Sequence, residues 1–235
     1  MIRIILFSSI FFCLLVQHSV AQGWSSVGRW TKFPKKEDVS YSEINGSCFW
    51  NQNWLRARVT MKNGEVFYLP KAKLNLYTEE IHYLNEAGAE LAIQNQVNAV
   101  AFYSSPDTAK TEIFKSLNSG LLLNDKDAFV NRKEVYVQIL VDGKIRLLKM
   151  TKVKLLRREA DPLTRRMEWN FEPRENYFIE ESYDIRPLGS VNKDHLFTLI
   201  KKEEADEEWL KSNKNKLHKE VDIVSFLNYR NSLVK

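Results

Sequence analysis

Cysteine, glycine and proline are scarce in this chain. Its 235 residues include 2 cysteines, 8 glycines and 6 prolines, which excludes a disulfide-rich scaffold, a collagen-like repeat and a low-complexity sequence. Hydrophobic residues make up 44% of the sequence and aromatic residues 12%, enough for one sizeable core. The composition therefore indicates a globular protein of one domain or two small ones.

The motifs of common catalytic sites are also missing. The sequence contains no Gly-x-Ser-x-Gly elbow, no glycine-rich phosphate loop, no His-Glu-x-x-His and no Cys-x-x-Cys. His82, His195 and His218 follow residue 21, and no two of them are spaced as ligands of one metal on one element. We therefore assign no catalytic, cofactor-binding or metal-binding residue, expect no cofactor, and lean against an enzyme.

A long apolar run occurs once, at the N-terminus. Arg3 precedes a mostly apolar stretch at 4–16 that Ser8 and Ser9 interrupt, and residues 19–21 have short side chains of the kind that a signal peptidase recognises. We predict a signal peptide over residues 1–21, cleaved after Ala21, and an exported protein that is periplasmic or secreted. Because a membrane-spanning helix needs about 20 apolar residues, we expect no transmembrane segment after cleavage.

Cleavage also changes the cysteine and charge counts. Loss of Cys13 leaves Cys48 as one thiol, which cannot form a disulfide within the chain and is predicted to be a small buried hydrophobe. Loss of Arg3 lowers the net charge from +5 to +4. The densest basic stretch contains Lys149, Lys152, Lys154, Arg157 and Arg158. A solvated outer strand face accounts for this stretch, and we expect no nucleic-acid partner.

Strand patterns dominate the first two thirds of the mature chain. Residues 22–53 carry Trp24, Trp30 and Trp50 without a clear period, which predicts an irregular aromatic-rich arm packed on a sheet. Residues 54–103 alternate between apolar and polar positions around turns such as Asn63-Gly64. Asn-Gly between alternating runs is a strong hairpin signal, so we predict five or six antiparallel strands in a meander, with a primed turn at Gly64.

A second hairpin follows, with Asp142-Gly143 at its turn. Before it, residues 111–117 fit a short helix or a strand, and residues 120–131 are polar enough to form a loop. After it, residues 157–174 are highly charged and predict a long exposed loop. Residues 177–179 and 183–185 are predicted to be the last two strands.

The hydrophobic period changes to that of helices after residue 190. Asn192 is placed to cap a first helix, and further helices are predicted at about 203–213 and 219–231. Trp209 and Leu210 should point inward from the second. Inward positions of the third are Val221, Val224, Phe226, Leu227 and Leu233.

These patterns together predict the fold class and its boundaries. We expect an α+β fold in which an antiparallel, hairpin-rich β-meander forms a β-rich body over residues 54–189. A C-terminal cluster of short helices over residues 190–235 should cap it. Residues 22–235 are expected to form one compact unit.

Several polar residues are candidates for a functional site. His82 lies in an alternating strand and should face solvent, whereas His195 stands at a helix start, where a cap explains it. Two pairs of neighbouring carboxylates, at residues 79–80 and 180–181, fall at predicted turns and should be exposed.

A resemblance rests on phrases spread over most of the mature chain. These are residues 46–47 and 59–64, the run Leu-Asn-Leu-Tyr-Thr-Glu-Glu-Ile at 74–81, the hairpin at 141–145 and the ending Phe-Leu-Asn-Tyr-Arg-Asn at 226–231. Together with the signal peptide, they resemble uncharacterised exported proteins of Bacteroidetes. The resemblance implies export and architecture, transfers no site residue, and does not include Cys48.

Two functions of different classes fit this sequence. The first is an exported non-enzymatic binding or interaction module whose sheet presents a face or an edge to a protein or cell-envelope glycan. The alternative is a cell-envelope glycan hydrolase that uses carboxylates brought together by the fold. The tryptophans distinguish them, because exposed coplanar indoles would suit sugar stacking and buried indoles would anchor the arm.

Overall fold

The fold is that of a computed structural model. The structure describes residues 44–93, 96–104, 111–122, 134–161, 163, 166–213 and 217–233. The predicted signal peptide and residues 22–43 of the predicted arm lie outside this range. Within it, no helix has the length and hydropathy of a membrane-spanning segment.

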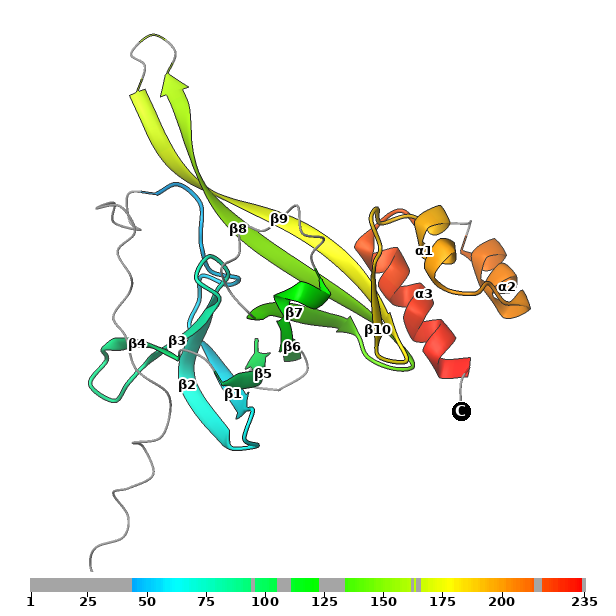
Figure 1. Ribbon diagram of the computed structural model, residues 1–235, viewed down its shortest axis with the longest axis horizontal. Coiled ribbons are helices and arrows are strands. Elements are labelled where there is room, and N and C mark those ends of the chain that lie inside the picture. The colour runs from blue at the N-terminus through cyan, green and yellow to red at the C-terminus, as the bar shows by residue number, and fades with distance from the viewer. Residues whose placement is uncertain are drawn as a thin grey trace, which may run out of the picture.

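One antiparallel sheet of ten strands forms the body (Figure 1). Its order is β10-β9-β8-β7-β6-β5-β1-β2-β3-β4. The strands are β1 (Leu55–Met61), β2 (Val66–Asn75), β3 (Glu80–Leu84), β4 (Glu90–Ile93), β5 (Val97–Tyr103), β6 (Thr111–Asn118), β7 (Glu134–Val141), β8 (Ile145–Asp161), β9 (Arg166–Glu181) and β10 (Asp184–Pro187). Three C-terminal helices complete the predicted α+β class, which is confirmed, and residues 111–117 form a strand.

The two hairpins predicted from Asn-Gly and Asp-Gly are both present, as β1–β2 and β7–β8. The prediction of a primed turn in the β1–β2 hairpin is wrong. Gly64 donates its N–H to the Met61 carbonyl at 3.0 Å and has a φ of +88°, whereas Asn63 is not among the residues with positive φ. Lys62 and Asn63 therefore form a type I turn, and Gly64 follows it in the left-handed conformation. The Glu65 carbonyl accepts from the Met61 N–H and closes the hairpin.

One connection departs from a simple meander. Strands β1 to β4 follow one another across the sheet, but β5 returns to pair with β1, from Arg56 opposite Tyr103 to Met61 opposite Val97. Strand β1 is therefore central rather than an edge, with β2 on one side and β5 on the other. This places the outward residues of β2, β1, β5 and β6 on one continuous face.

The charged residues 157–174 are not the exposed loop that the sequence predicted. Strands β8 and β9 run through them as a two-stranded ribbon that projects beyond the body (Figure 1). Arg158 lies opposite Glu168 and forms an ion pair with Glu172, while the Arg157 guanidinium lies 5.9 Å from the Trp169 ring centre. Charges on facing positions attract across an antiparallel pair, so a charged stretch can be a strand.

The segment before β1 connects distant strands. Asn45 pairs in parallel with Asn170 of β9, and Phe49 pairs with Asn75 at the end of β2. Trp50 packs inward at 5.0 Å from the ring centre of Phe114. Residues 44–53 therefore form an irregular segment that contacts the sheet.

The curled sheet encloses the largest hydrophobic cluster. This cluster draws buried side chains from the segment before β1 and from strands β1 to β9, including Val59, Leu74, Ile81, Phe102 and Phe171. A smaller cluster, with Val137, Met150 and Phe178, lies on the opposite face and includes Leu122, which follows the 3-10 helix Ser119–Leu121.

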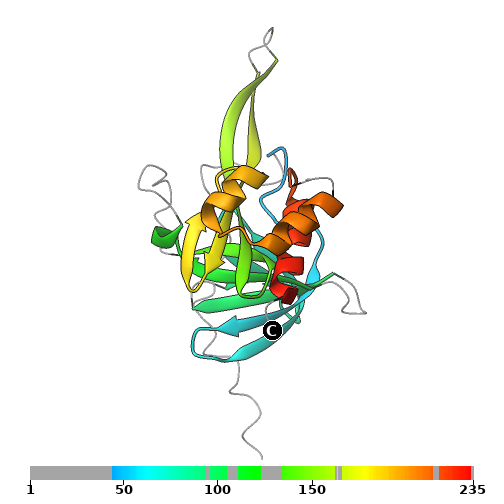
Figure 2. The same cartoon turned by 90° about the vertical axis from the view of Figure 1, so that its right-hand side faces the viewer.

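Helices α1 (Lys193–Leu199), α2 (Glu204–Ser212) and α3 (Glu220–Leu233) cover the end of the sheet nearest the β7–β8 turn (Figures 1 and 2). Asn192 caps α1 as predicted, by accepting from the His195 N–H at 2.9 Å. Two inward positions predicted for α3 are wrong: Val221 is 62% exposed and Leu233 48%. The buried stripe is Ile223, Phe226, Leu227 and Arg230, at the i, i+3, i+4, i+7 spacing of one helix face.

Candidate functional site

His82 is buried rather than solvent-facing, which corrects the prediction. Its Nδ1 lies 3.0 Å from Glu90 Oε1, and its Nε2 lies 3.7 Å from Glu80 Oε2. The Phe49 ring meets the imidazole edge-on at 5.5 Å between ring centres. The alternation of β3 was identified correctly, but Phe49, which pairs with Asn75 at the end of β2, packs its ring against the side chain. An imidazole with 1% of its side chain exposed has no approach for a substrate.

The paired carboxylates are also less exposed than predicted. Glu80 and Glu180 are both buried, and Glu180 lies 3.5 Å from the Arg146 guanidinium. Glu79 accepts a hydrogen bond from the Tyr136 N–H at 3.0 Å, where β7 has no pairing with β8. Burial, with the nearby negative charges of Glu79, Glu134 and Glu80, raises the pKa of the Tyr136 phenol. These carboxylates hold the fold together.

Cys48 is buried, as predicted, with 3% of its surface exposed. Burial raises the pKa of its thiol to about 12, so the neutral and weakly nucleophilic form dominates at neutral pH. His195 makes the predicted cap contact and also accepts from the Ser190 N–H at 2.9 Å. Among the described residues, no group of three His, Cys, Asp or Glu side chains is arranged to hold a metal ion.

The basic stretch on β8 is engaged within the protein. The Lys149 ammonium lies 2.7 Å from Glu175 and 2.9 Å from Glu220, and the Tyr177 hydroxyl also contacts both carboxylates. Burial lowers the pKa of Lys149, but the two glutamates outweigh it and leave the pKa raised. This cluster attaches the start of α3 to the sheet and is not an open cationic surface.

The described tryptophans in and next to the predicted arm, Trp50 and Trp54, pack against the protein. Trp50 packs against Phe102 and Phe114 in the core, and Trp54 lies under the Lys73 ammonium at 4.5 Å from its ring centre. Trp24 and Trp30 lie outside the described residues. Trp50 and Trp54 therefore form no exposed coplanar platform.

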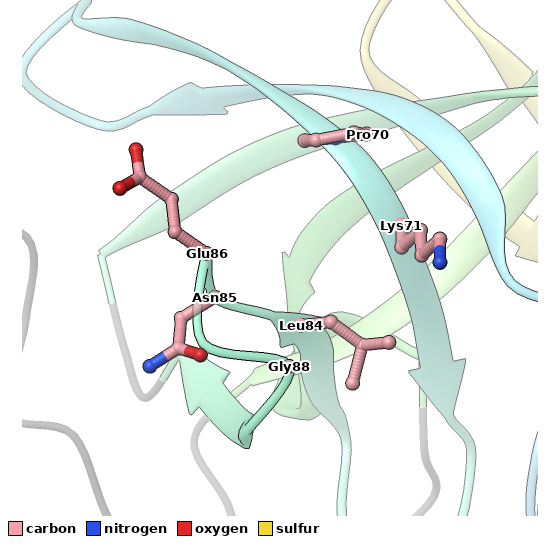
Figure 3. Close-up of a pocket in the computed structure, with 6 residues that line it drawn as sticks. All are labelled: Pro70, Lys71, Leu84, Asn85, Glu86 and Gly88. Atoms are coloured by element: carbon pink, nitrogen blue, oxygen red, sulfur yellow. The ribbon is translucent and has the colours of Figure 1, made fainter.

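A small depression lies where the β3–β4 turn diverges from β2 (Figure 3). Its volume is about 230 Å³, below the range of about 300–1,000 Å³ typical of small-molecule pockets. Leu84 points toward β2, whereas Asn85 and Glu86 point away from it (Figure 3). Glu86 is the one carboxylate in the lining, so this depression lacks a pair of catalytic acids.

The sheet face turned away from the largest core cluster carries a row of side chains across four strands. Neighbouring positions on a strand point to opposite faces, so the burial of Val59 in the core places Arg58 outward. Arg58 lies directly opposite Tyr68 on β2 and Ala101 on β5, and Ala101 lies opposite Ile113 on β6. The row therefore contains an aromatic ring, a guanidinium, a small residue and an aliphatic side chain.

A second row lies at the next outward position along the same strands. Thr60 lies opposite Val66 and Ala99, and Ala99 lies opposite Lys115. None of the outward positions paired in these registers is acidic. We call this surface the outer-face patch, and it comprises Arg56, Arg58, Val66, Tyr68, Ile113 and Lys115.

The outer-face patch is open to solvent. Tyr68 is 72% exposed, Val66 46% and Ile113 38%. Within the part of the chain that the structure describes, neither Arg58 nor Lys115 has a carboxylate partner, and Tyr68 has no ring contact. An exposed apolar and aromatic surface of this kind commonly marks a binding site. The patch could not be predicted from the sequence, because its residues come together only through the pairing of four strands. The alternation of polar residues along β1 was the one signal that the sequence offered.

Comparison with known proteins adds no relative: no protein-family model, curated protein or solved structure matches this chain.

Proposed function

We propose that the protein is an exported, non-enzymatic binding module that uses the outer-face patch to hold a partner in the periplasm or outside the cell. The observation that supports this function is the patch itself, a sheet face with a 72% exposed tyrosine and two cations that have no carboxylate partner among the described residues. The N-terminal pattern of residues 1–21 and the resemblance to exported proteins of Bacteroidetes support the location. The other polar clusters described are occupied by contacts within the chain.

A glycan hydrolase finds less support. That reaction needs two carboxylates facing one cleft at about 5–10 Å from each other. Glu80 and Glu90 both contact His82, but the imidazole lies between them and is buried. The described residues thus offer this carboxylate pair no cleft in which a sugar could lie.

Site-specific photo-crosslinking in the exporting cell tests the proposed function. A photoreactive phenylalanine analogue at Tyr68 should give a crosslinked adduct, because this position is exposed within the patch. The matched control places the analogue at Tyr183, which is 93% exposed on the β9–β10 turn. An adduct at position 68 alone supports the proposal, and the absence of an adduct, or equal adducts at both positions, contradicts it.

A further inference from the structure

We infer that the ligand of the outer-face patch is an acidic polysaccharide, a chain of sugars that carries carboxylates. This inference rests on the proposed function and names the class of partner. It is carried by two features of the patch: cations on strands two spacings apart with no acidic side chain at the outward positions between them, and an exposed tyrosine directly opposite one of these cations.

The cations set the charge and the length of the ligand. Arg58 on β1 and Lys115 on β6 are separated by two strand spacings, or about 10 Å across the sheet. A polymer that repeats its negative charge along its length can contact both, and the outward positions around them carry no acidic side chain to repel it.

The uncharged side chains favour sugars over other polyanions. Tyr68 lies opposite Arg58, with Cβ atoms at about 5 Å in such a pair, so a pyranose ring can stack on the phenol while its carboxylate meets the guanidinium. Val66 lies beside Tyr68 on the same face of β2 and suits the apolar face of a sugar, and Ile113 offers a second apolar contact at the far end of the row. Single-stranded nucleic acid is usually bound by several stacked aromatic rings, whereas Tyr68 is the one strongly exposed ring in the patch.

Binding of the purified mature chain to defined polymers tests the inference. The probes are polygalacturonate as the acidic polysaccharide, dextran as the neutral one, polyglutamate as an acidic peptide, and oligo-dT. We expect binding to polygalacturonate that weakens with added salt, and no binding to dextran. Arg58→Glu and Tyr68→Ala should each weaken this binding by about tenfold, an effect of the size of one lost charge or stacking contact.

Matched variants away from the patch control for net charge and aromatic loss. Lys144→Glu changes the same charge at the exposed β7–β8 turn, and Tyr183→Ala removes another exposed tyrosine. Both should bind like the unmodified protein. Lys115→Glu on β6 provides a second, independent charge reversal within the patch, and thermal unfolding of each variant verifies folding.

The outcomes separate this inference from the proposed function. Binding to polyglutamate or oligo-dT as tight as to polygalacturonate, or equal weakening by Lys144→Glu, overturns the polysaccharide. A lack of binding to polygalacturonate also overturns the inference that the ligand is an acidic polysaccharide. If the Tyr68 crosslink then joins a protein, the binding module stands with a different partner; if no crosslink forms either, both proposals fail.

Discussion

Gly64 has a backbone conformation that side chains resist. Its φ is +88°, and a Cβ added to it would meet no atom within 4 Å, so the cost of a side chain lies in the backbone alone. We predict that Gly64→Val destabilises the protein by about 1–2 kcal/mol, which corresponds to a fall in Tm of about 2–8 °C. Thermal unfolding measures it. Gly64→Asn is the matched control, because asparagine tolerates this conformation; equal losses for both variants would contradict the explanation.

Cys48 should resist thiol reagents in the native protein. Its burial and raised pKa, about 12, leave little thiolate at pH 8, and the thiolate is the reactive form. For the chain that begins at Gln22 and so lacks Cys13, we expect almost no labelling by a disulfide-exchange reagent in buffer and one equivalent per chain in denaturant. Rapid labelling of the folded protein would show that Cys48 is accessible.

At the scale of elements, the Asn231 side chain of α3 contacts the β7–β8 hairpin next to its turn. Asn231 donates to the Ile145 carbonyl at 2.8 Å and accepts from the Ile145 N–H at 3.0 Å. A Cβ on Gly143 would lie 2.5 Å from Asn231 Nδ2. The glycine in the turn is therefore required by the helix, because any side chain there displaces the amide from the strand.

A double-mutant cycle tests this contact. Asn231→Ala should destabilise the protein by about 1–3 kcal/mol through two lost hydrogen bonds. Gly143→Ala should cost a similar amount by displacing Asn231, and the double variant should cost less than the sum of the two. Denaturant unfolding measures the three free energies. Additive losses would show that Gly143 and Asn231 act independently.

Local signals predicted most elements, and non-local contacts explain the rest. The hairpin at Asp142-Gly143 and the cap at Asn192 follow from neighbouring residues. The β8–β9 ribbon was missed because residues 157–174 carry charges at strand positions, and these charges are paired only when the two strands of the ribbon face each other. His82 was misplaced because Phe49, from a segment remote in sequence, packs against it. The outer-face patch likewise depends on the return of β5 to β1.

For the whole molecule, the N-terminus of the mature protein is the first property to measure. The apolar run and the short residues before Gln22 predict cleavage after Ala21. N-terminal sequencing of protein recovered from the periplasm or medium should begin at Gln22, and substitution of Ala21 by Arg should block processing. Recovery of a chain that retains Met1 would refute export through a cleaved signal.

The segment before β1 has a consequence for the order of folding. Asn45 contacts Glu168, a residue 123 positions away, so the N-terminal part of the mature chain cannot complete its contacts until β9 has been synthesised. Contacts of such separation slow folding and leave the nascent chain extended for longer. For the exported protein that we propose, contacts that can form only after most of the chain has been made would favour crossing the membrane before the fold is complete.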